Sequence, residues 1–255
     1  MLKRTTAVAG LKGGCGRTTT VAALGGILNA RGGKVLLVDL DARGNLTRTF
    51  FGDSSVFAGK SIYEAFKRRG RVPAYPCPGH DGLDIVPATI SACAIDSEFC
   101  RRPDYNFHLK NLLSQVEGDY DHILIDCPGN PGVALANAVV AADGVLYPCV
   151  ADAFSVAGLL DFRAFLDICR NVNPDATLDG VFLTRFNPRR SMDSVVPRTL
   201  REESEGAFLD TVIRECSAFG QAAASGLDIL SYSPDCNGTA DYLRLLNEII
   251  NRQNN

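Results

Sequence analysis

Glycines and hydroxyl side chains follow the first apolar segment of the chain. Residues 10–20 are Gly-Leu-Lys-Gly-Gly-Cys-Gly-Arg-Thr-Thr-Thr, and an amphipathic helical pattern comes next. Glycines let a backbone curl so that successive N–H groups point at one anion, and the N-terminus of the following helix adds positive potential. The order of strand, glycine-rich loop and helix therefore predicts a phosphate-binding loop, in which Thr18 gives its hydroxyl to Mg²⁺. A glycine-rich turn without a ligand is the structural alternative.

This loop departs from the strict P-loop pattern at two positions. Leu11 stands where the first glycine belongs, and Arg17 stands where the lysine belongs. Arg17 keeps the positive charge, but its guanidinium is planar and bulkier than an ammonium group. We therefore expect this arginine to affect phosphate binding and catalysis to different extents.

The elements that must position this loop follow an alternating pattern. Short apolar runs alternate with segments of helical periodicity, which predicts an α/β fold: a doubly wound, mostly parallel sheet of about eight strands with helices on both faces. The expected strands are 5–9, 34–40, 83–87, 122–126, 144–150, 180–184, 210–213 and 228–232. The clearest helices are expected at 18–30, 105–116, 155–171 and 239–252. Residues 70–82, rich in proline and glycine, are expected to form an irregular connection within a single domain of residues 1–255.

Four segments resemble one known family. Residues 12–19 resemble the deviant P-loop of the ParA/MinD superfamily of ATPases, closest to the ParA-type partition ATPases. Residues 35–47 resemble the family segment that carries an aspartate for the attacking water, 120–129 its Walker B strand and switch, and 228–243 its closing strand and helix. The resemblance spans residues 5–252. It implies a P-loop NTPase that uses ATP, ADP and Mg²⁺ as a nucleotide-dependent homodimer, in plasmid or chromosome partitioning or in positioning another cargo, with a ParB-like or other stimulating protein partner.

The resemblance also implies a role for each candidate site residue. Lys12 is expected to reach the partner subunit's phosphates in the dimer, and Asp41 to position the attacking water. Mg²⁺ is assigned to Thr18, Asp39 and Asp126, because carboxylates at the carboxyl ends of parallel strands face the ligand crevice. The nucleotide is assigned to Lys12, Gly13, Gly14, Cys15, Gly16, Arg17, Thr18 and Thr19, with Arg185, Asn187 and Pro234 on the adenine side. The alternatives are an exposed loop lysine for Lys12 and helix caps or solvated acids for the aspartates.

At Arg17 the resemblance sharpens the expectation. An arginine does not fit beneath the β and γ phosphates as the family's lysine does. We expect nucleotide to bind while hydrolysis is slow, which makes an ATP hydrolase of low turnover the leading interpretation. A nucleotide-binding switch that acts through a protein partner with little catalysis is the second interpretation, and a MinD-like membrane-cycling ATPase is the third.

Charge bears on DNA and membrane binding. The formal net charge of −3 excludes a chain that binds nucleic acid over its whole surface. ParA-type relatives place several arginines after the seventh expected strand. Here Glu215 and Ala218 occupy two of those positions and Arg214 is the one arginine that remains, so weak non-specific DNA binding is expected. The other basic groups, which are either DNA contacts or solvated faces, are 67–69 with Arg71, 101–102, 189–190, and Arg198 with Arg201.

The last expected helix ends in Asn-Arg-Gln-Asn-Asn rather than in a basic amphipathic tail, so no membrane partner is expected. Hydrophobic residues at 46% and charged residues at 22% are typical of globular proteins. No signal peptide or membrane span is indicated, and we expect a cytoplasmic location. Nine cysteines without a Cys-x-x-Cys pair favour reduced thiols over a zinc, disulfide or iron–sulfur site.

Overall fold

A seven-stranded sheet forms the centre of the computed structural model, which describes residues 2–68, 70–102, 104–116, 118–152, 154–187 and 195–254. The strand order is β3-β4-β2-β5-β1-β6-β7. All neighbouring pairs are parallel except β3 with β4, so the predicted mostly parallel sheet is confirmed. The strands are β1 (Thr5–Val8), β2 (Val35–Asp39), β3 (Tyr75–Pro76), β4 (Leu83–Val86), β5 (His122–Asp126), β6 (Gly144–Val150) and β7 (Thr177–Thr184).

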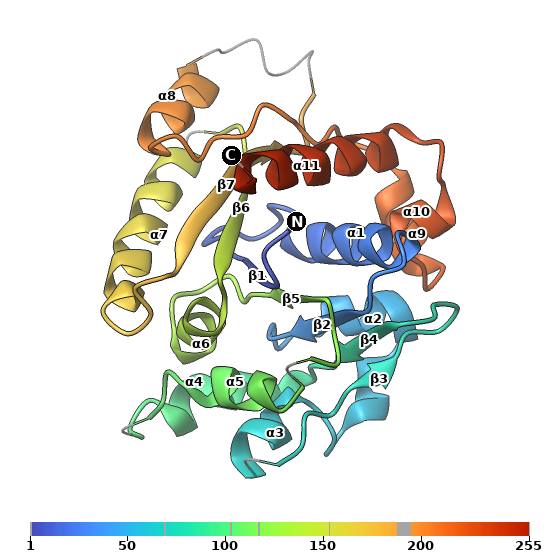
Figure 1. The fold of residues 1–255 in the computed structure, drawn as a ribbon, viewed down its shortest axis with the longest axis vertical. Coiled ribbons are helices and arrows are strands. Elements are labelled where there is room, and N and C mark those ends of the chain that lie inside the picture. The colour runs from blue at the N-terminus through green and yellow to red at the C-terminus, as the bar shows by residue number, and fades with distance from the viewer. Residues whose placement is uncertain are drawn as a thin grey trace.

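Helices cover both faces of this sheet, as predicted for a doubly wound fold (Figure 1). One face carries α3 (Ile62–Arg68), α4 (Ala94–Phe99), α5 (His108–Leu113), α6 (Val133–Ala141), α7 (Ser155–Arg170) and α8 (Val195–Glu203). The other carries α1 (Arg17–Ala30), α2 (Asn45–Phe51), α9 (Ala218–Ala224), α10 (Ile229–Tyr232) and α11 (Asn237–Gln253). Short 3₁₀ turns are η1 (Ser54–Phe57), η2 (Ile90–Cys93) and η3 (Ser114–Val116).

The interior position of β2 in the sheet explains why its sequence is a continuous apolar run. Leu36 and Val38 pack in the core beneath α3 to α8, whereas Val35 and Leu37 pack in the core beneath α1 and α11. A strand covered on both faces needs apolar side chains in both directions, which removes the usual alternation. The core beneath α1 and α11 buries one face of α11, including Tyr242, so this last helix packs on the sheet.

Two of the expected strands are wrong. Residues 229–232 form the short helix α10, because the Asp228 carboxylate accepts hydrogen bonds from the backbone N–H groups of Leu230 and Ser231 at 2.8 and 3.2 Å and so caps a helix. Residues 210–213 run beside β7 with only isolated bridges on either side and form no regular strand. The connection 70–82 contributes the two-residue antiparallel strand β3, which the sequence did not indicate.

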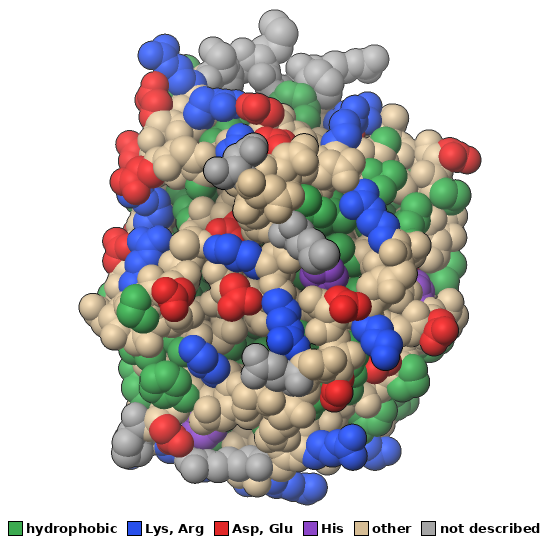
Figure 2. Space-filling view, viewed as in Figure 1, with side chains coloured by type: hydrophobic (Ala, Val, Ile, Leu, Met, Phe, Trp, Pro, Cys, Tyr) green, Lys and Arg blue, Asp and Glu red, His purple; other side chains and the backbone are tan. Residues whose placement is uncertain are grey.

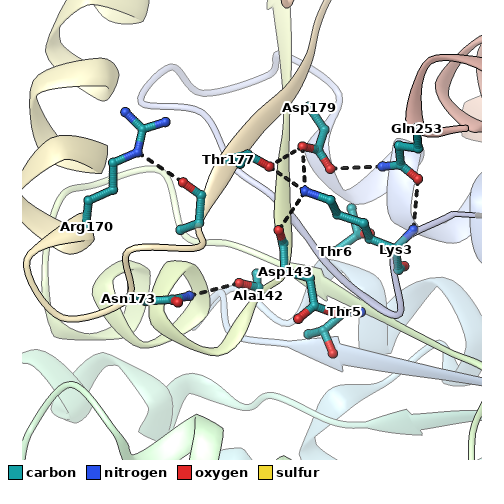
Figure 3. Close-up of polar contacts among 11 residues, drawn as sticks. Lys3, Thr5, Thr6, Ala142, Asp143, Arg170, Asn173, Thr177, Asp179 and Gln253 are labelled. Atoms are coloured by element: carbon teal, nitrogen blue, oxygen red, sulfur yellow. Dashed lines mark hydrogen bonds and ion pairs between the residues drawn. The ribbon is translucent and has the colours of Figure 1, made fainter. Parts of the chain in front are cut away.

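Lys3 joins the two ends of the chain at the amino edge of the sheet (Figure 3). Its Nζ donates to the Asp143 carbonyl at 2.9 Å, to the Thr177 hydroxyl at 2.5 Å and to the Asp179 carboxylate at 3.0 Å. Gln253, at the end of α11, accepts from the Lys3 backbone N–H and donates to the Asp179 carboxylate, each at 2.9 Å. This network anchors the edge of the sheet opposite the phosphate loop. None of the helices in the described ranges combines the length and apolar character needed to cross a bilayer.

Candidate functional site

The phosphate loop joins β1 to α1 at the carboxyl edge of the sheet. Gly14 and Gly16 have φ values of 72° and 92°, which side chains other than glycine rarely adopt. The Thr184 hydroxyl, at the end of β7, donates to the Cys15 carbonyl at 2.8 Å and so attaches the loop to the end of that strand. Strand, loop and helix therefore occur in the predicted order, with glycines where the backbone needs a positive φ.

A cleft of about 350 Å³ opens over this loop. Its walls come from the phosphate loop, the segment after β2, the end of β7 and the helices α9 and α11. The lining residues are 14–19, Asp41, Arg43, Asn45, Thr184, Arg185, 213–216, Phe219 and Tyr242. The predicted residues Gly14 to Thr19, Asp41 and Arg185 thus share one cleft. Asn187 and Pro234 are not among the lining residues, and Lys12 and Gly13 lie outside the lining of the cleft.

Thr18, Asp39 and Asp126 meet beneath the cleft. The Thr18 hydroxyl donates to Asp126 Oδ2 at 2.7 Å, and Asp39 is the register partner of Asp126 across β2 and β5. Both carboxylates are fully buried. Burial raises the pKa of Asp126 well above its ordinary value, the nearby Asp39 carboxylate raises it further, and the Thr18 hydrogen bond opposes both effects.

This group fits a divalent cation. Among the described residues, Asp126 Oδ1 is a buried oxygen without a hydrogen-bond partner, on a carboxylate that already orients the Thr18 hydroxyl. Hard cations such as Mg²⁺ prefer carboxylate and hydroxyl oxygens and relieve the cost of buried negative charge. No cluster of three His, Cys, Asp or Glu side chains able to hold a metal occurs in the part of the chain that is described. A cation here therefore needs further oxygens from phosphate or water.

Asp39 also positions the segment that carries Asp41. Its Oδ2 accepts from the backbone N–H and the hydroxyl of Thr47, at 2.9 and 2.8 Å, and its Oδ1 accepts from the Asp41 N–H at 3.1 Å. Burial raises the pKa of Asp39 to about 7, although the Thr47 hydrogen bonds oppose the shift. The half-buried Asp41 accepts from the Arg43 N–H at 3.0 Å and lines the cleft. Asp39 thus fixes the turn between β2 and α2, and Asp41 is the carboxylate that faces the cleft.

Arg17 is buried and its donors point at backbone carbonyls. Nη1 donates to the carbonyls of Gly10 and Lys12 at 2.6 and 2.7 Å, and Nε donates to the Cys127 carbonyl at 3.0 Å. Nη1 also lies 3.4 Å from Cys15 Sγ, and burial raises the pKa of that thiol. The guanidinium therefore fills the space between the phosphate loop and the loop that follows β5.

Lys12 forms an ion pair with Asp152 of its own chain. Its Nζ also lies 5.9 Å from the ring centroid of Phe154, which is exposed. Asp152 in turn accepts from the Phe154 N–H at 3.1 Å through its other oxygen. The cation that the resemblance assigns to a partner subunit is thus neutralised within this chain.

The far side of the cleft combines arginine, glutamate and aromatic side chains. Arg185, with φ 51°, approaches the Glu215 carboxylate at 3.7 Å. Arg214 donates from Nε and Nη2 to the buried carboxylate of Asp241 at 2.9 and 2.8 Å. Arg69, Arg189 and Arg190 of the basic groups named above lie outside the described residues.

Several residues that shape the site were not singled out from the sequence. Asp152 follows the carboxyl end of β6 by two positions, so the strand-edge rule that selected Asp41 could have found it. Phe219 and Tyr242 come from helices that approach the cleft only through tertiary packing. No local pattern marks them.

The comparisons with known proteins cover nearly the whole chain. A family model described as an AAA domain matches residues 3–177. The chromosome partitioning protein ParA of Caulobacter vibrioides is 31% identical over 98% of this chain and 95% of its own length. The sporulation initiation inhibitor protein Soj of Bacillus subtilis is 29% identical over 95% of this chain and 96% of its own.

Solved structures agree with this likeness. Cobyrinic acid a,c-diamide synthase from Mycobacterium smegmatis with bound ATP analog and magnesium superposes with a TM-score of 0.85 at 25% identity, over 99% of this chain and 96% of that one. The septum site-determining protein MinD of Pyrococcus horikoshii, complexed with Mg-ADP, superposes with a TM-score of 0.77 at 20% identity, over 96% of this chain and 95% of that one, and supports the fold alone.

Proposed function

The chain belongs to the ParA family of P-loop ATPases, and from this premise we propose that it hydrolyses ATP slowly as a nucleotide-gated homodimer that partitions DNA or positions another cargo. One observation carries the proposal. A single cleft brings the phosphate loop and Asp41 together above the Thr18–Asp126 pair, whose free carboxylate oxygen suits a cation. A phosphate loop, a carboxylate for water and a cation site are the parts that phosphoryl transfer requires.

Thr18 and Asp126 would hold Mg²⁺ at this site. The ion supplies positive charge beside the β and γ phosphates when it is bound. Asp39 keeps the β2 segment in register and lies next to Asp126, so it would act on the cation's surroundings rather than as a free ligand. Bound nucleotide provides the remaining oxygens.

Hydrolysis needs a water placed in line with the γ phosphorus. Asp41 lines the cleft and would accept a hydrogen bond from that water, which attacks the phosphorus as the bond to the bridging oxygen breaks, giving ADP, inorganic phosphate and a proton. Lys12 would leave Asp152 and neutralise the partner subunit's phosphates in the dimer. Arg17 is engaged with three carbonyls, which supports low turnover.

The same engagement of Arg17 favours a second candidate, a nucleotide-binding switch with little catalysis. In that case binding alone would drive dimerisation and recruitment of a protein partner. A comparison of turnover between wild type and Arg17→Lys separates the two candidates. A lysine variant that hydrolyses ATP at least tenfold faster supports a slowed ATPase, and one that is no faster contradicts that explanation of low turnover.

The mixed charge of the surface supports a proposal of weak DNA binding. Figure 2 shows basic and acidic side chains interspersed over one face of the molecule. Arg214, the one arginine left at the positions where relatives place several, is already paired with Asp241. We propose non-specific DNA contact confined to the dimer. A gel shift of the ATP-bound protein at 50 and 200 mM salt tests it, since a phosphate-driven complex weakens as salt rises.

Membrane cycling has less support. The apolar residues Tyr242, Leu246 and Ile249 of α11 are buried against the sheet and are not available to lipid. Cosedimentation with anionic vesicles in the presence of ATP checks this point, and nucleotide-dependent binding to the vesicles would reverse our preference.

The central experiment is a titration of the purified protein with a fluorescent ADP analogue in the presence of Mg²⁺ or of EDTA. We expect binding that Mg²⁺ strengthens, and ATP-dependent dimers by light scattering. Asp41→Asn should bind nucleotide normally and lose turnover, whereas Asp126→Asn should lose the effect of Mg²⁺. Absence of nucleotide binding under both conditions would overturn the proposed function.

A further inference from the structure

The loop that follows β5, residues 127–132, is anchored at both ends. On one side, the Asp96 carboxylate of α4 accepts from the Asn130 side chain at 3.2 Å and from the Ala134 N–H at 3.0 Å. On the other side, the Cys127 carbonyl accepts from Arg17 Nε at 3.0 Å. We call residues 127–132 the β5 loop. It begins directly after the cation-site residue Asp126.

Arg17 forms hydrogen bonds with two different segments of the chain. Its Nη1 donates to the Gly10 and Lys12 carbonyls of the phosphate loop, and its Nε donates to the Cys127 carbonyl of the β5 loop. A guanidinium offers five N–H donors in a rigid planar fork, so one side chain can bridge two segments at fixed geometry. A lysine concentrates its three donors on one nitrogen and cannot reproduce both contacts.

The β5 loop is shaped to receive this side chain. A Cβ built on Gly129 would lie 2.8 Å from Arg17 Nη2, so a side chain at this position would displace the guanidinium. Arg17 itself is only 8% exposed. The arginine and the glycine therefore fit each other.

We propose that Arg17 is a positioning residue that fastens the β5 loop to the phosphate loop before nucleotide arrives. The loop is thereby held in place beside Thr18 and Asp126 in the free protein, and Nη2, for which no acceptor is seen among the described residues, is left to meet phosphate. The inference deepens the proposed function, on which it rests for the identity of the ligand. The tether itself is a property of the free protein.

The test measures backbone order in free protein labelled with ¹⁵N. In wild type, the amides of Gly129 and Asn130 should have order parameters near 0.85, the value of rigid backbone. In Arg17→Lys, which keeps the charge, they should fall below about 0.6, while values elsewhere in the sheet stay unchanged. Gly129→Ala should produce the same local loss by displacing Nη2 without altering the arginine.

Arg43→Lys is the matched control. Arg43 lines the same cleft, no hydrogen bond or ion pair seen among the described residues joins its side chain to the β5 loop, and the substitution has the same chemistry. Unchanged order in the β5 loop of Arg17→Lys and Gly129→Ala would overturn the tether, as would a loss of order spread over the whole molecule. If both variants loosen the loop but none of the proteins binds the ADP analogue, the tether stands and the proposed function fails.

Discussion

Replacing Asp152 by asparagine should strengthen nucleotide-dependent dimerisation. In the free chain Lys12 is paired with Asp152, and it must leave that partner before it can reach the phosphates of a second subunit. Asparagine removes the charge but keeps an oxygen that can accept from the Phe154 N–H and the Ser155 hydroxyl, as Asp152 Oδ1 does at 3.1 Å in each case. The start of α7 should therefore be preserved.

The size of the effect follows from exposure. The side chains of Lys12 and Asp152 are 36% and 35% exposed, so solvent and salt screen their attraction. Partly exposed ion pairs contribute about 0.2 to 1 kcal/mol, which corresponds to a factor of about 1.4 to 5 in an equilibrium constant. Because each homodimer releases two such pairs, we expect the dissociation constant of the dimer to decrease by a factor of about 2 to 30, and the gain to shrink as salt increases.

Sedimentation of the protein with a non-hydrolysable ATP analogue measures this constant. Asp161→Asn is the control, because Asp161 is an exposed acid on α7 and its substitution changes the net charge by the same amount. Equal effects of the two substitutions would mean that overall charge, and not release of Lys12, governs dimerisation. A weaker dimer in Asp152→Asn would refute the reasoning outright.

Four further substitutions, two of them compared as a pair, test the fold and the cation site. His80 Nε2 lies 2.8 Å from the Asp228 carboxylate, and this hydrogen bond raises the pKa of His80 above 6.5. Burial acts to raise the pKa of Asp228, but the hydrogen bonds from His80 and Ser231 outweigh it and lower that pKa. The free energy of unfolding lost in His80→Gln should thus be largest between about pH 5 and 6, and should decline as the pH rises through the folded pKa of His80, in urea titrations from pH 5 to 9. Asp126→Asn should raise the melting temperature in EDTA by about 2–4 °C, because burial and the neighbouring Asp39 carboxylate make ionisation of Asp126 costly in the folded chain and asparagine does not ionise; an unchanged or lower value in calorimetry would contradict this reasoning. Gly44→Ala should cost about 2 kcal/mol or more, since Gly44 has φ 60° and a Cβ there would lie 2.9 Å from a backbone carbonyl; Gly59→Ala, with φ 77° and open space, should cost about 1 kcal/mol in the same denaturation assay.

The sequence predicted the sheet and the cleft where local pattern and topology agree. The run Val35–Val38 and the carboxylates that follow it indicate a buried parallel strand and its carboxyl edge, and Asp41 and Asp126 lie there. The expected strand 228–232 failed because apolar residues at 229 and 230 suit either a strand or a helix, and the cap at Asp228 decides between them. The strand edge marks Asp152 as a candidate, but its pairing with Lys12, and the approach of Phe219 and Tyr242 to the cleft, depend on tertiary packing that no local pattern indicates.

The two cations of the phosphate loop pose one energetic question, which is why nucleotide should bind where both are already engaged. Arg17 donates to neutral carbonyls, and Lys12 is paired at a half-exposed position. Hydrogen bonds from a cation to a phosphate are charge-assisted at both ends and are stronger than those to a carbonyl. The Lys12 pair with Asp152 contributes at most about 1 kcal/mol. Exchange of the Lys12–Asp152 pair for phosphate is therefore favourable, whereas Arg17 can keep its three carbonyl contacts because Nη2 is the nitrogen left to meet phosphate. Binding and catalysis are therefore separable at this loop. Lys12 and Nη2 of Arg17 can still bind phosphate, whereas the three backbone carbonyls hold the Arg17 guanidinium and keep it from moving toward the leaving oxygen as negative charge develops there.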